Sequence, residues 1–159
     1  LDVRIRLGSL EAGIAGSRLL EALKKLKKFC PHFHLSLQSG SDRVLKSMNR
    51  HYTAEEYLNS VELIRKYFPE AAVTTDIICG FPTESEEDFL KTLEVARRAR
   101  FSDIHIFIYS PREGTAAAKL KPLDKAVVKA REEELKRLKY ELKALFIDQN
   151  LGKVRQLLT

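Results

Sequence analysis

Four short apolar segments, each rich in β-branched or aromatic side chains, are the first regular pattern along the chain. Each is short enough to be a strand, and together they predict strands buried on both faces. They begin about 30 to 40 residues apart, a spacing that suits strand–helix–strand units. The segments are residues 3–7, 33–37, 72–78 and 104–108.

A pattern with helical periodicity follows each predicted strand. Two of these patterns begin with a capping box, in which a Ser or Thr and a Glu three residues later bond each other's backbone N–H groups. The first helix is predicted to begin at Ser17 and to be closed by Pro31, and the last to run over residues 124–149. The predicted boxes are Thr53 with Glu56 and Thr83 with Glu86.

Alternating strands and helices predict an α/β fold with a parallel sheet and right-handed crossovers. Such units build either an open doubly wound sheet or a (β/α) barrel. Neither a Gly-x-Gly-x-x-Gly motif nor a phosphate-binding loop follows any predicted strand, which favours the barrel. We therefore predict a partial (β/α) barrel of four parallel strands with their helices.

The amino-acid composition indicates the class of protein and the sign of its net charge. The chain has 159 residues, of which 44% are hydrophobic and 31% charged, as in one globular domain. Its net charge of +6 suits a nucleic-acid partner but also an ordinary basic surface. The last helix is crowded with Lys, Arg and Glu side chains, which have the same two interpretations: a solvated face or an RNA-facing stripe. No apolar run approaches the roughly 20 residues that cross a bilayer.

The two cysteines, Cys30 and Cys79, lie far apart and have no metal-ligand spacing. We interpret both as small core residues in a reducing compartment. No metal-binding His pair and no Ser-His-Asp order is visible either. The sequence therefore predicts no metal site and no catalytic group of its own.

Polar residues follow every predicted strand. In a parallel sheet these strand ends meet at one edge, where ligands bind. Ser, Gly and Asp are also common loop residues, so each segment alone has a purely structural explanation. Together they would surround one cavity with amide, hydroxyl, carboxylate and guanidinium groups, a mixture that suits a zwitterionic, ribose-bearing ligand. The segments are residues 8–11, 38–42, 75–76 and 109–115.

Asp76 interrupts an apolar strand, and an unpaired buried carboxylate is costly. It could contact a ligand, or it could form an ion pair with Arg4 or Arg6 on the neighbouring strand. His34 and His105 also lie inside predicted strands, and we expect them to be hydrogen-bonded core histidines.

These segments resemble the radical-SAM tRNA methylthiotransferases, in order and over nearly the whole chain. The matching blocks are RIRLGSLE at 4–11, HLSLQSGSD at 34–42, MNR at 48–50 followed by YT at 52–53, TDIICGFP at 75–82 and YSPREGT at 109–115. The blocks RLGSLE at 6–11 and FCPHFH at 29–34 look most like the branch acting on threonylcarbamoyl-adenosine beside the anticodon. The isopentenyl-adenosine and ribosomal-protein branches stay open.

The resemblance implies a radical-SAM barrel of six strands, of which residues 1–150 would supply the third to sixth. Residues 151–159 would begin the linker to a C-terminal RNA-binding β-domain. Family enzymes hold a [4Fe–4S] cluster on a Cys-x-x-x-Cys-x-x-Cys loop, which this chain does not contain. Because the chain also begins at Leu1 rather than Met, we expect a piece of a longer protein that is inactive alone.

The resemblance also implies the cofactor, the substrate and the site. S-adenosylmethionine would be the ligand, tRNA the substrate and the cytoplasm the location, with no membrane attachment. By position, the residues lining the cofactor pocket would be Ser9, Gln38, Ser39, Arg50, Asp76 and Arg112. The alternatives are a radical-SAM oxidoreductase with another substrate and a non-catalytic RNA-binding module. An unclosed barrel would leave residues 3–7 as an unpaired edge, through which we expect the fragment to self-associate.

Overall fold

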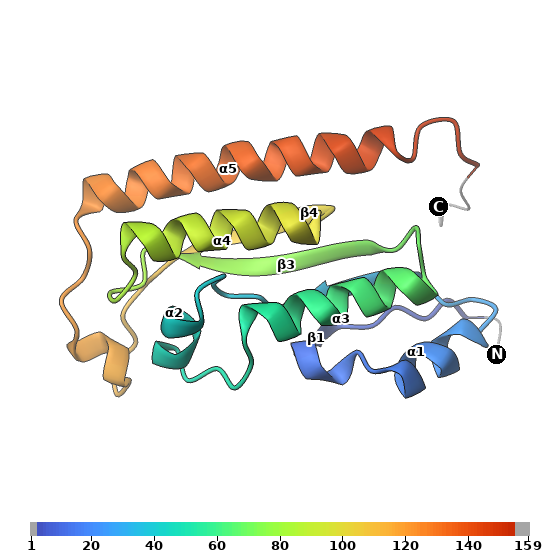
Figure 1. The fold of residues 1–159 in the computed structure, drawn as a ribbon, viewed down its shortest axis with the longest axis horizontal. Helices are drawn as coiled ribbons and strands as arrows, with labels where there is room; N and C mark the ends of the chain where they lie inside the picture. Colours follow the sequence, from blue (N-terminus) through green and yellow to red (C-terminus); the bar gives the residue numbers. More distant parts are fainter. Residues whose placement is uncertain (1–2, 155–159) are drawn as a thin grey trace.

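Four parallel strands form one sheet in the order β1-β2-β3-β4 (Figure 1) in the computed structural model, which describes residues 3–154. This arrangement of four parallel strands with helices confirms the predicted α/β class. The elements are β1 Ser9–Leu10, η1 Ala12–Ile14, α1 Ser17–Lys24, β2 His32–Leu35, α2 Asp42–Ser47, α3 Ala54–Tyr67, β3 Ala72–Cys79, α4 Glu86–Ala99, β4 Asp103–Ile108, η2 Ala116–Lys119 and α5 Lys125–Asp148.

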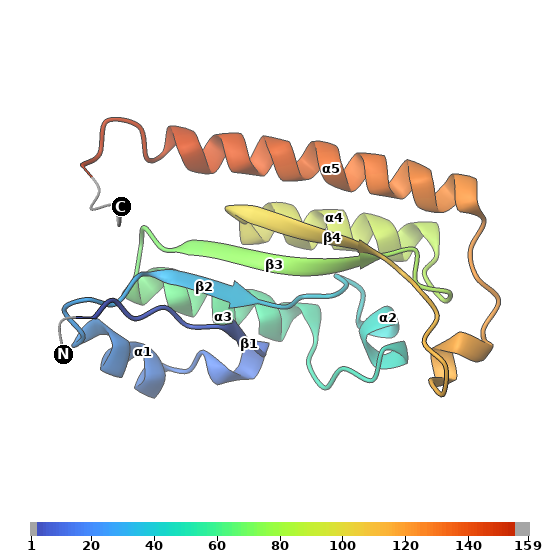
Figure 2. The ribbon, with the colours of Figure 1, turned by 180° about the vertical axis from the view of Figure 1, so that it is seen from behind.

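The two faces of the sheet have different surroundings. Helices α1, α3 and α4 lie over one face, and α5 runs along β4 and α4 (Figure 1). Seen from behind, the strands of the other face are not covered by any helix of the described residues (Figure 2). We call these the covered face and the open face. Side chains alternate between them, so in β2 Phe33 and Leu35 are fully buried while His32 and His34 are only partly so.

The core lies between the covered face and the helices. Phe29, Phe33 and Phe68 pack with ring centroids 5.4–5.6 Å apart. Tyr57 of α3 is fully buried, and its hydroxyl donates to the carbonyl of Leu35 at 2.8 Å. Burial of these aromatic side chains fixes the helices against the strands.

Three of the four predicted strands are confirmed, but the first is wrong. In residues 3–7 only Ile5 forms a bridge, to Phe29, and the paired strand β1 begins later, at Ser9. The prediction required burial on both faces, whereas Val3 and Ile5 are 52% and 39% exposed. Within the described residues this segment has a neighbour on one side only, so its apolar residues are left at the sheet edge. Self-association through this edge stays a prediction.

The helix starts confirm one predicted capping box and contradict the other. Thr53 and Glu56 cap α3 as expected. In front of α4, however, the box consists of Ser85 and Asp88 rather than Thr83 and Glu86. Residue Thr83 instead belongs to the turn before the helix, which Glu84 closes by donating its N–H to the carbonyl of Phe81 at 2.9 Å.

The remaining helix predictions differ in their ends. α1 stops at Lys24, well before Pro31, so the proline does not close it. The short helix α2 was not predicted, because its six residues are too few to show a periodic stripe. α5 runs over Lys125–Asp148 between the caps Asp124 and Gln149, as predicted. None of the helices in residues 3–154 is both long and apolar enough to span a membrane.

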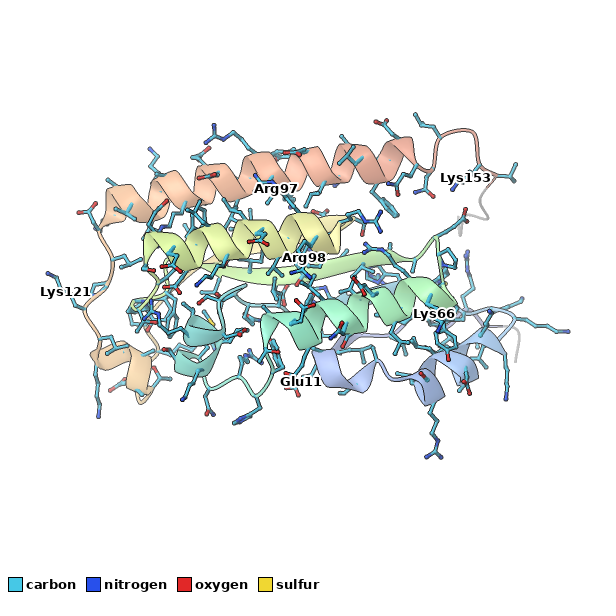
Figure 3. The ribbon with its side chains drawn as sticks, in the orientation of Figure 1. Glu11, Lys66, Arg97, Arg98, Lys121 and Lys153 are labelled. Carbon is cyan, nitrogen blue, oxygen red and sulfur yellow. The ribbon has the colours of Figure 1, made fainter. Side chains whose placement is uncertain are left out.

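Four of the seven basic side chains of α5 form ion pairs within the chain. Lys139 and Lys143 each lie 3.1 Å from a carboxylate oxygen of Asp103, and Lys136 lies 2.8 Å from Glu132. Arg97, Arg98 and Lys66 are spread over the helix layer instead (Figure 3), where Arg98 pairs with Glu55 at 3.1 Å. These ion pairs favour a solvated helix face over a continuous RNA-facing stripe.

Arg131 ties α5 to the turn before α4. Its guanidinium donates to the carboxylate of Glu84 at 2.7 Å and lies 5.2 Å from the ring centre of Phe89. Both members of this ion pair are buried, and burial raises the pKa of Glu84 while Arg131 opposes the rise. The pair holds the segment after β3 in place, next to the carboxyl ends of the strands.

Candidate functional site

A cleft of about 730 Å³ lies at the carboxyl ends of β3 and β4. Four of the six predicted pocket residues line it: Gln38, Arg50, Asp76 and Arg112. They come from the loop after β2, the segment after α2, the middle of β3 and the loop after β4, so the fold brings together residues far apart in sequence. Apolar side chains complete the walls, among them Met48, Ile78, Phe81 and Phe107.

Gln38 has an unusual backbone conformation in the cleft wall. Its φ is 65°, in the left-handed region that non-glycine residues rarely adopt. Two hydrogen bonds to β3 hold it there, from its own N–H to the carbonyl of Asp76 at 2.8 Å and from the N–H of Ile78 to its carbonyl at 2.9 Å. Asn49, another cleft residue, has a φ of 58°. Strained backbone held by its surroundings is concentrated at functional sites.

The predicted pocket residue Ser39 does not reach this cleft. It is fully buried on the other side of the loop, with its hydroxyl 3.4 Å from that of Thr92 on α4. The next residue, Gly40, packs so closely on α4 that an added Cβ would lie 2.6 Å from the Cα of Thr92. The loop after β2 therefore presents Gln38 to the cleft and Ser39 to the helix.

Asp88 fixes the same loop to α4. It accepts a hydrogen bond from the hydroxyl of Ser41 at 2.6 Å and forms an ion pair with Arg43. Burial alone would raise the pKa of Asp88, but hydrogen bonds from Arg43, Ser41 and Ser85 outweigh it and hold the pKa well below its ordinary value. Asp88 is therefore a carboxylate that organises the cleft wall from behind.

Ser9, the sixth predicted residue, lines a separate hollow of about 680 Å³ on the open face. Its other walls carry ionisable side chains, including His32, His34, Asp103 and His105. Asp76 lines both this hollow and the cleft, so the two meet at that residue.

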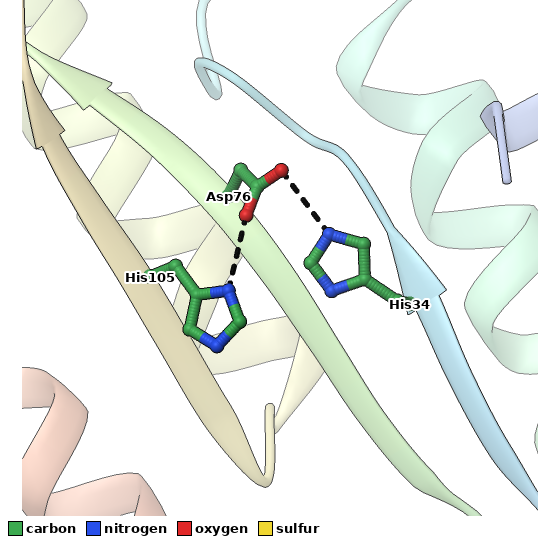
Figure 4. Close-up of side chains that lie close together, drawn as sticks. All are labelled: His34, Asp76 and His105. Carbon is green, nitrogen blue, oxygen red and sulfur yellow. Dashed lines mark hydrogen bonds and ion pairs between the residues drawn. The ribbon is translucent and has the colours of Figure 1, made fainter. Parts of the chain in front are cut away.

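The structure gives Asp76 other partners than those predicted (Figure 4). One carboxylate oxygen lies 3.1 Å from Nε2 of His34 and the other 3.3 Å from Nδ1 of His105. Arg6, one predicted partner, donates instead to His32 at 3.0 Å. The expectation that His105 lies in the core is wrong, because its side chain is 53% exposed on the open face.

Sequence reasoning missed this cluster because it compared spacings within single segments. The available signal was the strand alternation, which places His34, Asp76 and His105 on one face once the parallel register is known. That register pairs Asp76 with His105 and His34 with Thr74.

The structure confirms the prediction that Cys79 is a core residue. It is fully buried, and burial raises the pKa of its thiol to about 12, so it is a poor nucleophile or metal ligand at neutral pH. Cys30 is half-buried. With two cysteines in the whole sequence, the chain cannot supply the three thiolates of an iron–sulfur cluster loop.

Comparison with known proteins gives a family, close relatives and a fold. Residues 5–96, more than half of the chain, match the model of the Radical SAM superfamily. The chain is 50% identical over 133 residues to the tRNA-2-methylthio-N(6)-dimethylallyladenosine synthase of Mycobacteroides abscessus, covering 83% of this chain and 26% of that protein. It is 44% identical over 156 residues to the enzyme of the same name from Caldicellulosiruptor saccharolyticus, covering 98% and 33%. The chain thus spans a third or less of the length of these relatives.

Among solved structures, coproporphyrinogen III oxidase from Escherichia coli, described as a radical SAM enzyme, aligns with a TM-score of 0.71. The alignment covers 89% of this chain and 33% of that one, at 18% identity. At that identity the likeness concerns the fold alone, and it agrees with the predicted radical-SAM type of partial barrel.

Proposed function

The chain belongs to the Radical SAM superfamily, and we propose that it is part of an enzyme that inserts a methylthio group into an N6-modified adenosine of tRNA. The observation that carries the proposal is the convergence of Gln38, Arg50 and Arg112 on one cleft at the carboxyl ends of the strands. The names of the relatives supply the reaction and the substrate class.

The cleft offers the groups that S-adenosylmethionine requires. The guanidinium groups of Arg50 and Arg112 suit the methionine carboxylate, and the amide of Gln38 can both donate to and accept from ribose hydroxyls. The apolar walls formed by Ile78 and Phe107 suit the adenine ring. When bound, S-adenosylmethionine would supply the deoxyadenosyl group for radical formation and the methyl group for transfer.

An iron–sulfur cluster does not fit the cysteines of this chain, as the burial of Cys79 shows. We propose that the cluster-binding cysteines lie elsewhere in the whole protein. The role of the described residues is then to bind and orient the cofactor and to shape the cavity. We expect the 159-residue chain to be inactive alone and the whole protein to act on tRNA in the cytoplasm.

The modified base has two candidates. Residues 6–11 and 29–34 resemble the threonylcarbamoyl-adenosine branch, but the relatives carry the dimethylallyl-adenosine name and do not support that branch. The hollow on the open face is lined by Arg6 and three histidines but also by the carboxylates of Asp76 and Asp103, so its charge does not select between a substituent with a carboxylate and an apolar one. We therefore keep both bases as candidates.

The cofactor proposal can be tested with this chain by calorimetric titration of S-adenosylmethionine. We expect Arg112→Ala to weaken binding about 10- to 100-fold, since a charge-assisted hydrogen bond contributes roughly 1.5–3 kcal/mol. Arg97→Ala, on the outer side of α4, is the matched control and should bind like the unmodified chain. Equal affinities for all three chains would contradict the proposed contact between Arg112 and the cofactor.

The reaction is tested with the whole gene. tRNA from a deletion strain, with and without the gene restored, would be digested and its nucleosides measured by mass spectrometry. Loss and recovery of the methylthio form of dimethylallyl-adenosine or of threonylcarbamoyl-adenosine identifies the branch. Unchanged tRNA would favour a radical-SAM enzyme with another substrate. Unchanged tRNA together with tight, salt-dependent tRNA binding by the chain would favour the RNA-binding module.

A further inference from the structure

Three neighbouring strands place two imidazoles around one carboxylate on the open face. Asp76 comes from β3, His34 from β2 and His105 from β4 (Figure 4). One ring nitrogen of each histidine and one carboxylate oxygen of Asp76 lie within 4.8 Å of one another. Because all three residues stand on paired strands, their spacing is fixed by the sheet rather than by a mobile loop.

Hydrogen bonds with neighbouring hydroxyl groups orient this set. Nδ1 of His34 lies 2.9 Å from the hydroxyl of Thr74, which leaves Nε2 to face Asp76. The hydroxyl of Ser36 donates to Asp76 at 3.1 Å. Metal-binding histidines and carboxylates are commonly held by a second group in this way, which sets the ring orientation and strengthens the ligand.

The charge of the cluster favours a cation. The rings of His34 and His105 are stacked with their centres 5.5 Å apart, which places both beside the same carboxylate. The cluster therefore sets one carboxylate against two ring nitrogen atoms, and together these can bind a divalent ion. Asp76 and His34 are only 21% and 12% exposed, which reduces competition from water.

The donor set also selects the class of ion. Two imidazole nitrogens and one carboxylate suit Zn²⁺, Fe²⁺ or Co²⁺, whereas Mg²⁺ and Ca²⁺ prefer oxygen ligands. The cluster borders the hollow of about 680 Å³, so further coordination positions would be open to water or to a ligand. Three protein ligands with an open position are typical of metal sites that act on a bound molecule.

We infer that His34, Asp76 and His105 bind one divalent transition-metal ion on the open face of the sheet. The inference goes beyond the proposed function: it requires neither S-adenosylmethionine nor an iron–sulfur cluster. Asp76 lines both the hollow and the cleft, so an ion bound to it would lie beside the proposed cofactor.

The test is titration of the metal-free 159-residue chain with Zn²⁺ in a calorimeter, followed by Co²⁺ with its visible absorption spectrum. We expect one Zn²⁺ per chain and a Co²⁺ spectrum of nitrogen and oxygen ligands. Asp76→Asn and His105→Gln should lose stoichiometric binding, and Thr74→Val should weaken it about 10- to 100-fold through the orientation of His34. His51→Gln, at an exposed histidine outside the cluster, is the matched control and should bind normally.

Circular dichroism and a thermal melt of each variant establish that it is folded, so lost binding cannot be mistaken for lost structure. Absence of stoichiometric binding to the folded chain would overturn the inference. So would undiminished binding by His105→Gln, or a thiolate band in the Co²⁺ spectrum, which would assign the ion to Cys30. Because no cofactor is added, failure here leaves the proposed cofactor cleft untouched, and failure of cofactor binding leaves this site untouched.

Discussion

The covered and open faces of the sheet are built from the same strands but have different roles. On the covered face, Phe33, Leu35, Ile77 and Ile104 are almost completely buried under the helices. On the open face, the corresponding strand positions carry histidines, Asp76 and the half-exposed Phe107. Strand alternation thus separates the residues that stabilise the fold from those available to a ligand.

The largest difference between the faces should appear when the same residue type is shortened on each. Phe33→Ala on the covered face should lower the free energy of unfolding by about 3–5 kcal/mol, because it leaves a cavity in the aromatic cluster. Phe107→Ala on the open face should cost less than about 1 kcal/mol, since that side chain is 53% exposed. Chemical denaturation of both variants measures the difference, and equal losses would contradict the distinction between the faces.

The covered side is further tested at the buried ion pair between α5 and the turn before α4. Arg131→Met should destabilise the chain by about 3 kcal/mol, because it leaves the carboxylate of Glu84 buried without its partner. The double variant Glu84→Gln, Arg131→Met should recover most of this loss. If the single variant unfolds at the same denaturant concentration as the unmodified chain, the pair does not hold α5 in place.

The contact that holds the loop after β2 against α4 is tested at Asp88. Asp88→Asn should cost about 2 kcal/mol at neutral pH, since hydrogen bonds to a charged acceptor are weakened. Because folding lowers the pKa of Asp88, its stabilising effect is complete at neutral pH. It is lost as the pH falls below the ordinary Asp value of about 3.9. The gap between the two chains should therefore narrow in acid, and a gap that stays constant with pH would contradict the role of the charge.

The smallest change in stability is expected at the sheet edge. Ile5→Lys should alter the free energy of unfolding by less than about 0.5 kcal/mol, because Ile5 is 39% exposed. It should nevertheless reduce self-association of the chain, since a charged side chain disfavours edge pairing. Light scattering at several concentrations measures this. An unmodified chain that is monodisperse and monomeric would contradict the prediction.

The sequence allowed the prediction of elements whose signals are local, and missed those that depend on neighbours. Thr53 and Glu56 form the expected box because both partners lie in one segment. The box at Thr83 failed because a second candidate, Ser85 with Asp88, follows two residues later, and contacts from Arg43 and Ser41 reinforce it. Periodicity alone cannot weigh such contacts between distant segments.

The same limit applied to the site. Residues at strand ends were predicted to converge, and Gln38, Arg50, Asp76 and Arg112 do so. Ser39 was predicted to share the wall with Gln38, but adjacent residues point in opposite directions, and Ser39 is buried against α4. The cluster around Asp76 required the register of three strands, which the sequence does not specify.

The close packing of Gly40 on α4 links the cleft to a region far from it. A Cβ added at Gly40 would lie 2.6 Å from the Cα of Thr92, so the backbone of the loop after β2 packs directly on the backbone of the helix. Any shift of α4 would therefore displace the loop that carries Gln38. Helix α4 therefore supports the cleft as well as the core, and a glycine is required at position 40 for it to do so.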